Sequence, residues 1–240
     1  MALPRIDAPT YELELPVSKK KIKYRPFLVK EQKILLMAME SGESDVIETN
    51  IRQILQNCAV TEIDIDALPL IDIEYYFLNL RAKSVGEIVE TKYKCENVVN
   101  EKVCGNMMET EFNITDVKVQ MPVDLNDLIK ITDKVGIKLK YPDYSVVNRI
   151  RKSESVTDIA FELILECIEY IYDEDNLYYA KESTKEELMT FLESLTKEQF
   201  GRIEEYIDNL PKLEKTIEMT CNKCGYDHKI KVQGLDDFFG

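Results

Sequence analysis

The sequence predicts an α+β fold, with a mostly helical body and a split pair of β-hairpins. Apolar residues recur at helical three-and-four spacing in several runs between residues 28 and 82 and between residues 123 and 210. They alternate with polar residues between residues 86 and 122, and again over 216–232. Each alternating region also carries two cysteines, with a glycine directly after the second of them. These regions therefore predict hairpins built around a pair of thiols.

Composition restricts the class of protein. The formal net charge is −14, which argues against a nucleic-acid or anionic-membrane partner, because such binding needs clustered Lys and Arg. The basic cluster at residues 18–25 alternates with Ile22 and Tyr24, which favours the solvated face of an edge strand over a DNA contact. The N-terminus lacks the apolar region of a signal peptide, and no run reaches the roughly 18 apolar residues of a membrane span.

The first segment, residues 1–84, is expected to contain short strands followed by helices. Three helices with one apolar face each are predicted over residues 28–42, 44–58 and 70–82. Cys58, like Cys167 further along the chain, lies inside an apolar helical pattern. Both cysteines are therefore expected to be small buried side chains and not metal ligands.

The second segment, residues 85–122, is predicted to form a hairpin. Residues 86–95 and 108–122 both alternate between apolar and polar side chains. The loop "CENVVNEKVCGN" joins them and contains Cys95 and Cys104. Two alternating runs joined by such a loop indicate a hairpin with a metal-binding tip.

The third segment, residues 123–212, is predicted to be a helical insertion. Helices are expected over residues 123–135, 155–173, 183–195 and 196–210, with a short strand over 136–142. Three pairs at capping-box spacing mark helix starts: Ser155 and Asp158, Ser183 and Glu186, and Thr196 and Gln199.

The helix over residues 155–173 is expected to be central. Ile164 and Ile168 should be buried, opposite a solvated acidic stripe that includes Glu162 and Glu166.

The fourth segment, residues 213–240, supplies a second hairpin with Cys221 and Cys224 at C-x₂-C spacing. If the two hairpins face each other, Cys95, Cys104, Cys221 and Cys224 form a tetrahedral thiolate site, and we expect one structural Zn²⁺ per chain. Four unliganded thiols are the alternative. Gly105 and Gly225 suit a backbone that turns through positive φ.

His228, the single histidine of the chain, is expected to be a packed or half-exposed strand residue. Its place along the strand should carry it away from the cysteines and not make it a ligand.

The sequence shows no catalytic motif. Phosphate-binding glycine loops and the H-E-x-x-H zinc motif are absent, and a nucleophile–histidine pair would have to use His228. Four thiolates around a metal leave no open position for water, so Lewis-acid catalysis is not expected there. The chain is therefore predicted not to be an enzyme.

Several stretches resemble the T4-type bacteriophage baseplate protein family. They include "YRPFLVKEQKILLMA" at residues 24–38, residues 57–87, the cysteine hairpin, "GIKLKYP", and the ending "CNKCGYDHKIKVQGLDDFFG". The likeness is strongest at "LRAKSVGE", residues 80–87, and at "GLDDFF". It implies a subunit or an assembly protein of the baseplate hub, with other hub or tail proteins as partners. It also implies a location in the host cytoplasm during infection, or in the tail baseplate of the virion.

Two surfaces are candidates for partner binding. Phe238 and Phe239 follow the last predicted strand, and the alternative is that they pack on the core of the chain's own ribbon. Arg81 and Lys83 lie in the "LNLRAKSVGE" turn, where local pairing with neighbouring carboxylates is the alternative.

Two other functions remain open at this point. A zinc-ribbon adaptor in transcription or another nucleic-acid process would share the cysteine pattern, although the acidic charge counts against it. A metallo-enzyme would need an open metal position.

Overall fold

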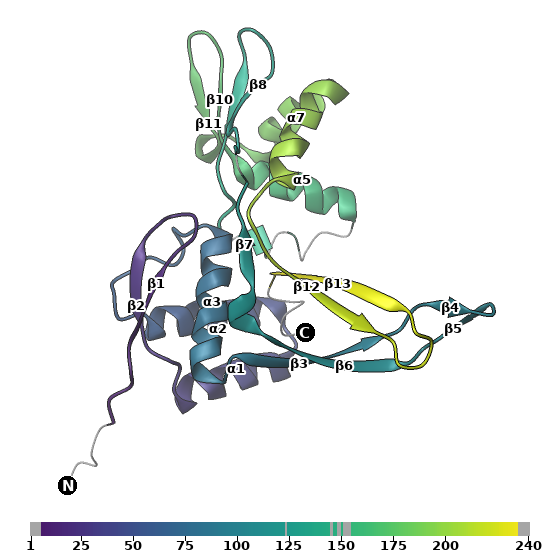
Figure 1. Cartoon of the computed structure of the whole chain (residues 1–240). Helices are drawn as coiled ribbons and strands as arrows, with labels where there is room; N and C mark the ends of the chain where they lie inside the picture. Colours follow the sequence, from purple (N-terminus) through teal and green to yellow (C-terminus); the bar gives the residue numbers. More distant parts are fainter. Residues whose placement is uncertain (1–5, 123, 145, 148–149, 151–154, 235–240) are drawn as a thin grey trace.

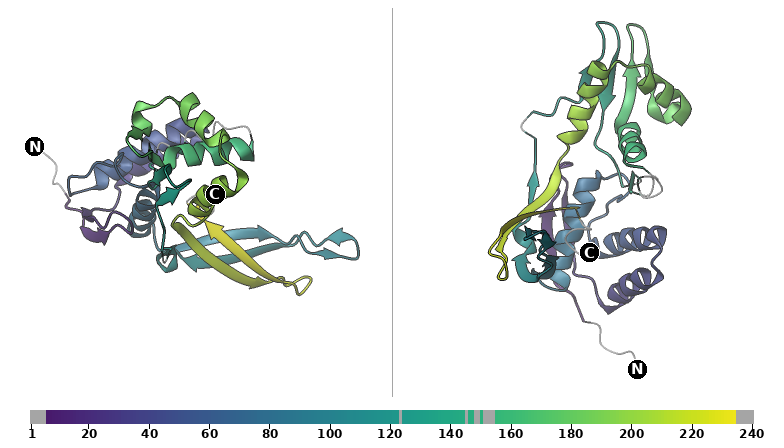
Figure 2. Two further views of the ribbon diagram at one scale, coloured as in Figure 1. Left: turned by 90° about the horizontal axis from the view of Figure 1, so that it is seen from above. Right: turned by 90° about the vertical axis from the view of Figure 1, so that its right-hand side faces the viewer.

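A computed structural model describes residues 6–122, 124–144, 146–147, 150 and 155–234. The chain is elongated, with an N-terminal body, a second body above it in Figure 1, and an arm of β-hairpins that projects sideways (Figures 1 and 2). Helices make up 38% and strands 29%, so the predicted α+β class is confirmed. None of the described helices has the length and apolarity that crossing a membrane requires.

The N-terminal body joins a β-hairpin to three helices. Its elements are β1 (Tyr11–Glu14), β2 (Lys21–Tyr24), α1 (Val29–Ser41), α2 (Ser44–Cys58) and α3 (Leu70–Ser84). The three helices coincide with the predicted ones to within two residues. In β2, Ile22 and Tyr24 point into the core while the alternating Lys21 and Lys23 are exposed, which confirms an edge strand at the basic cluster.

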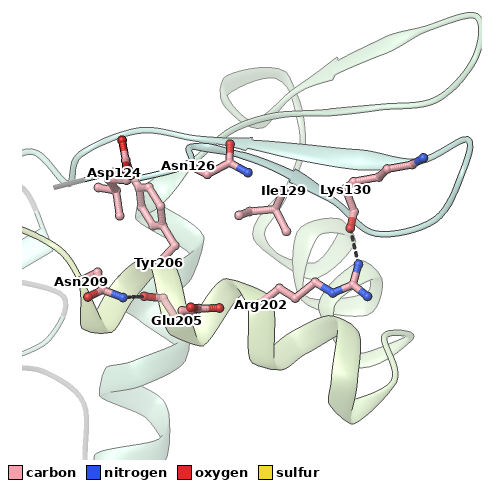
Figure 3. A pocket seen from close by; sticks show the side chains of 9 residues that line it. Asp124, Asn126, Ile129, Lys130, Arg202, Glu205, Tyr206 and Asn209 are labelled. Atoms are coloured by element: carbon pink, nitrogen blue, oxygen red, sulfur yellow. Dashed lines mark hydrogen bonds between the residues drawn. The ribbon is translucent and has the colours of Figure 1, made fainter. Parts of the chain in front are cut away.

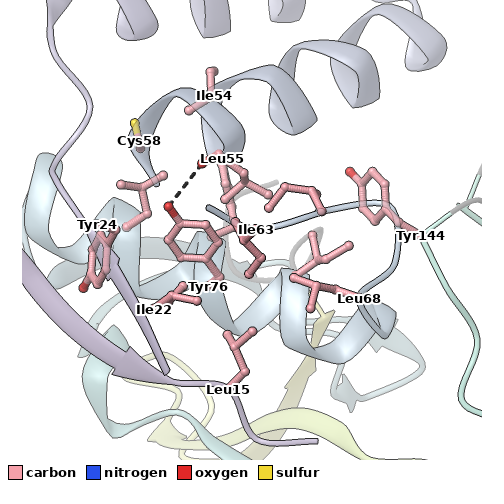
Figure 4. Packing of buried hydrophobic residues seen from close by; sticks show 14 residues of the cluster. Leu15, Ile22, Tyr24, Ile54, Leu55, Cys58, Ile63, Leu68, Tyr76 and Tyr144 are labelled. Atoms are coloured by element: carbon pink, nitrogen blue, oxygen red, sulfur yellow. Dashed lines mark hydrogen bonds between the residues drawn. The ribbon is translucent and has the colours of Figure 1, made fainter. Parts of the chain in front are cut away.

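The core of this body surrounds Tyr76 of α3, which is fully buried (Figure 4). Its hydroxyl donates a hydrogen bond to the Leu55 carbonyl at 3.2 Å, which satisfies the polar atom inside the core. Cys58 packs in the same cluster and is buried as predicted. Another face of α3 contributes Ile71, Leu78 and Ala82 to the core at the base of the arm. Helix α3 therefore joins the N-terminal body to the arm.

The arm consists of two hairpins. Strands β3 (Ile88–Lys94) and β6 (Met107–Asn113) pair antiparallel, and β4 (Val98–Val99) with β5 (Lys102–Val103) forms its tip. Strands β12 (Lys212–Thr220) and β13 (Asp227–Gln233) form the second hairpin.

The run predicted as one strand over residues 108–122 is divided. A 3₁₀ turn, η1 (Ile114–Asp116), follows β6, and β7 (Lys118–Gln120) then pairs with β12 and not with β3. The sheet order β13-β12-β7 thus ties the two hairpins together at their base.

The second body packs a sheet of order β11-β10-β9-β8 against helices. Its strands are β8 (Leu128–Lys130), β9 (Gly136–Leu139), β10 (Ile168–Tyr172) and β11 (Leu177–Tyr179). The helices of this body are α5 (Val156–Cys167), α6 (Lys185–Glu193) and α7 (Lys197–Asp208). The 3₁₀ turn η2 (Ala180–Glu182) leads from β11 into α6.

Two secondary-structure predictions in this body are wrong. The helix predicted over 123–135 does not form in its described residues, and residues 128–130 are a strand instead, because β8 pairs with β9 and buries Ile129. The helix predicted over 155–173 ends at Cys167, and the chain continues as β10. Ile164 and Ile168 are nevertheless 2% and 1% exposed, so their predicted burial is confirmed, as is that of Cys167.

The helix starts follow the predicted chemistry with one displacement. Thr196 and Gln199 form the expected capping box of α7, and the Ser155 hydroxyl accepts the Asp158 N–H. The cap of α6 lies one residue later than predicted, at Thr184 with Glu187.

The acidic stripe of α5 is only partly solvated. Glu166 is buried within 3.7 Å of the Lys140 ammonium, which contradicts a solvated position. Glu162 forms an ion pair with Lys185.

Candidate metal centre

Four cysteines converge where the two hairpins of the arm face each other. Cys95 directly follows β3 and Cys104 lies just before β6, while Cys221 and Cys224 lie in the turn between β12 and β13. Their four sulfur atoms all lie within 4.8 Å of one another. Cysteines more than a hundred residues apart in the sequence therefore share one site, as the sequence predicted.

The spacing of the sulfurs suits a tetrahedral ion. A tetrahedron with metal–sulfur bonds of about 2.3 Å has sulfur–sulfur edges of about 3.8 Å. The Cys95 and Cys224 sulfurs are 3.7 Å apart, and those of Cys104 and Cys221 are 3.9 Å apart. All four are free thiols, since a disulfide bond would bring two sulfurs to about 2.05 Å. The donor set thus fits a metal held by four thiolates.

The two turns that carry the cysteines differ in length but share two backbone features. Gly105 and Gly225 have φ of 66° and 73°, the left-handed region that glycine adopts without steric cost. The Gly105 N–H donates to the Cys95 carbonyl at 3.0 Å, and the Gly225 N–H donates to the Cys221 carbonyl at 2.8 Å. The expected role of both glycines is confirmed, and each turn presents its sulfurs from a fixed backbone.

The surroundings of the cluster are partly apolar. Cys95 and Cys221 are buried with Met108, while Cys104 and Cys224 are half-buried. Tyr93 and Met219 pack against the same group. This apolar shell restricts the access of water to two of the four sulfurs.

The thiols differ in acidity. Burial raises the pKa of Cys95 to about 12. Burial also acts to raise the pKa of Cys221, but the backbone N–H groups of Cys224 and Lys223 outweigh it and lower that pKa to about 6. The backbone N–H of Tyr226 contributes most to lowering the pKa of Cys224. The lowered pKa of Cys221 favours its thiolate form at neutral pH, and the thiolate is the form that binds metals.

His228 lies beside the cluster, contrary to the expectation that its strand carries it away. Its Nε2 is 3.2 Å from the Cys95 sulfur, and its ring packs edge-on against Tyr226 at 4.8 Å between centroids. The strand register explains the position, because His228 pairs with Met219, two residues before Cys221. The side chain is half-buried, as predicted.

The other candidate residues lie elsewhere. Arg81 donates to the Gly86 carbonyl at 2.8 Å, at the C-terminal end of α3. The Lys83 ammonium is 2.7 Å from a Glu87 carboxylate oxygen and 5.6 Å from the centre of the Tyr11 ring. Phe238 and Phe239 lie outside the described residues.

Two hollows lie in the second body, away from the cysteines. A pocket of about 340 Å³ lies between β8 and α7, where Arg202 donates to the Lys130 carbonyl at 2.8 Å (Figure 3). A groove of about 1260 Å³ runs between α5 and α6. Its charged lining includes the ion pairs Glu162–Lys185 and Glu166–Lys140. None of the described residues that line the pocket or the groove is a cysteine or a histidine.

Comparison with known proteins gives two matches. The family described as T4 bacteriophage base plate protein matches residues 8–240. The chain is also 24% identical over 230 residues to the baseplate hub assembly protein gp26 of Enterobacteria phage T4, across 95% of this chain and 97% of that protein. No solved structure matches the chain.

Proposed function

The chain belongs to the T4 bacteriophage base plate protein family, and from this premise we propose that it works in the hub of a contractile tail baseplate. It acts as a structural subunit or as an assembly chaperone, and it catalyses no reaction. The observation that carries this proposal is the extent of the match, which covers residues 8–240, together with a relative named for hub assembly.

The proposed mode of action is contact with other hub or tail proteins. A projecting arm offers surface on several sides, and residues such as Val98 and Val103 at its tip are more than half exposed. A metal held by four thiolates has no open position for substrate, which supports a structural role. Binding takes place in the host cytoplasm during infection, and a subunit would remain in the tail baseplate of the virion.

We also propose that the arm is a split zinc ribbon with one structural Zn²⁺ per chain, bound by Cys95, Cys104, Cys221 and Cys224. The sulfur spacing supports this assignment. The two segments of the proposed ribbon are residues 85–122 and 213–240, and residues 1–84 and 123–212 form the other two units of the chain.

Metal analysis of the purified protein tests the zinc centre. We expect about one zinc per chain in the wild type and strong loss of zinc from Cys221→Ser. Cys58→Ala is the matched control, because it removes a buried thiol far from the cluster in the fold and should leave the zinc content unchanged. A stable wild-type protein without zinc would refute the centre.

We propose Phe238 and Phe239 as the main partner-binding residues, with Arg81 and Lys83 at the end of α3 as weaker candidates. The ion pair of Lys83 with Glu87 favours the local role for this lysine. For the two phenylalanines, burial of each side chain is worth roughly 1.5–3 kcal/mol, which a partner surface can supply.

Complementation of a phage that lacks this gene tests the function. Deletion of residues 235–240 should block hub assembly while the truncated protein keeps its zinc and its melting temperature. Normal plaque formation by a phage supplied with the truncated protein would show that residues 235–240 are not part of the partner surface. A large fall in melting temperature would place the phenylalanines in the protein's own core.

Mass spectrometry of purified virions then separates the two hub roles. A subunit is present in the particle at fixed stoichiometry, whereas an assembly chaperone is absent from it. Salt-dependent DNA binding by the purified protein would instead support a nucleic-acid adaptor.

A further inference from the structure

Three side chains outside the cysteine set place a nitrogen atom within hydrogen-bonding distance of a sulfur. The Asn97 amide nitrogen is 3.6 Å from the Cys224 sulfur, and the Asn106 amide nitrogen is 3.5 Å from the Cys221 sulfur. The third is His228, with Nε2 3.2 Å from the Cys95 sulfur. Three of the four sulfurs thus each have their own side-chain neighbour, and the three neighbours come from both hairpins.

The positions of these side chains suit hydrogen bonds to the sulfurs and not metal ligation. An amide NH₂ group has no lone pair to offer a metal, so Asn97 and Asn106 can only donate through this nitrogen. His228 does not belong to the set of ligand atoms that lie within 4.8 Å of one another, which among the described residues contains the four sulfurs alone.

Each donor is held in place by a further contact. The second N–H of the Asn106 side-chain amide donates a hydrogen bond to the Asn222 side-chain oxygen at 2.7 Å. The Asn97 carbonyl accepts the Cys104 N–H at 2.8 Å, which fixes its backbone between the two cysteines of the first hairpin. The ring of His228 packs against Tyr226. Donors that are already oriented lose little conformational freedom when a charged acceptor forms.

We infer that His228, Asn97 and Asn106 are positioning residues of the proposed zinc centre, each donating an N–H to a different metal-bound thiolate. The inference rests on the zinc centre proposed above. A divalent ion with four thiolates carries a net charge of about −2, and hydrogen bonds to charged sulfur stabilise that charge in a partly apolar shell. The same bonds fix the direction of each thiolate toward the ion. This role requires a proton on Nε2 of His228, the ring nitrogen that lies 3.2 Å from the Cys95 sulfur.

Cobalt and zinc binding by the full chain test this role in His228→Phe and His228→Gln. Phenylalanine keeps an aromatic ring against Tyr226 but has no donor, whereas glutamine keeps an amide N–H at a similar reach. We expect His228→Phe to bind zinc about tenfold more weakly in competition with a chelating dye, with glutamine restoring most of the affinity. Asn106→Leu, which removes a second donor, should show a comparable loss.

Two further readouts separate positioning from ligation and from folding. The thiolate-to-cobalt charge-transfer band of His228→Phe should keep the intensity of four thiolates, and the melting temperature of the metal-free protein should match that of the wild type. Equal zinc affinity in the wild type and in both donor-free variants would overturn the inference while leaving the zinc centre intact. A cobalt spectrum that loses a nitrogen ligand in His228→Phe would overturn it by making His228 a ligand. A wild type without any cobalt band would instead overturn the zinc centre itself.

Discussion

Two carboxylates in the N-terminal body are fully buried, and both accept backbone N–H groups. Asp72 of α3 accepts the N–H groups of Val17 and Ser18, both at 2.8 Å, and so fixes the β1–β2 turn on the helix. Glu31 of α1 accepts the Leu28 N–H at 2.8 Å and pairs with the Arg25 guanidinium at 2.9 Å. Because a buried charge without partners is costly, these bonds specify where the hairpin and α1 lie.

Glu31→Gln should destabilise the protein at neutral pH by roughly 1.5–3 kcal/mol, because it weakens charged hydrogen bonds in a buried position. Burial opposes ionisation of Glu31, but hydrogen bonds from Arg25 and the Leu28 N–H outweigh it, so the pKa of Glu31 is below its ordinary value. Urea titrations of the wild type and the variant at several pH values measure the difference.

The sign of the pH dependence follows from that lowered pKa. The contribution of Glu31 is complete above the pKa of an unfolded glutamate, about 4.3, and it is lost as the pH falls through the lower pKa of the folded state. The stability difference between wild type and variant should therefore shrink below about pH 4. A difference that stays constant down to pH 2 would contradict this account.

Ile168→Ala should lower the free energy of unfolding by roughly 2–5 kcal/mol, because the side chain is buried in the core of the second body and leaves a cavity. Val156→Ala is the control, since Val156 is 83% exposed at the start of α5. If denaturant titration gave both variants the same small change, Ile168 would not lie in a rigid, closely packed core.

At the scale of elements, the sequence predicts helices better than the points where a helix gives way to a strand. In residues 123–135, Leu125 and Ile129 fit a helical face, while Ile129 and Ile131 fit a strand. The structure uses the second pattern because β9 offers a pairing partner, which local periodicity cannot reveal. The run after Cys167, "IEYIY", is rich in β-branched and aromatic residues. Its apolar residues also fit either a helix or a strand, so β10 was predicted as the end of a helix.

The candidate metal centre was more predictable than the fold around it. Cysteine spacing and the following glycines are local signals, and they predicted both turns. The position of His228 depends on the register of β12 against β13, and the donors Asn97 and Asn106 depend on how one hairpin faces the other. These relations between elements carry no signature within one stretch of sequence.

The same substitution in two glycines should have opposite effects. Gly201 lies inside α7 and Gly225 in the second cysteine turn, and an added methyl group would meet no atom within 4 Å at either place. Gly201→Ala should stabilise the protein by about 0.5–1 kcal/mol, because alanine favours the helix. Gly225→Ala should destabilise it by about 1–2 kcal/mol, because φ is 73° there.

Thermal unfolding of the purified protein measures both changes. The paired design excludes steric crowding as the cause, since both sites are open. Stabilisation by Gly225→Ala would contradict the backbone geometry of the turn.

At the scale of the whole molecule, the arm and the two bodies have separate apolar cores, and the cysteine cluster closes the arm at the side remote from α3. Removal of the proposed zinc with a chelator should therefore loosen the arm first. A ligand bound only by the folded state adds stability that grows with its concentration relative to its dissociation constant.

Hydrogen exchange with and without chelator measures this effect. We expect faster exchange in β3, β6, β12 and β13 after metal removal, and little change around Tyr76 in the N-terminal core. Uniform acceleration across the chain would show that the centre supports the whole fold and not the arm alone.

The separation of the cysteines in the sequence has a consequence for synthesis on the ribosome. Cys95 and Cys224 are 129 residues apart, and Cys104 and Cys221 are 117 residues apart. At about 5–20 residues per second, the first two thiols wait roughly 6–26 seconds for the second pair to be made. A nascent chain that stops before Cys224 cannot complete the four-thiolate site. Closure of the arm through all four thiols is therefore possible only after translation has passed this point.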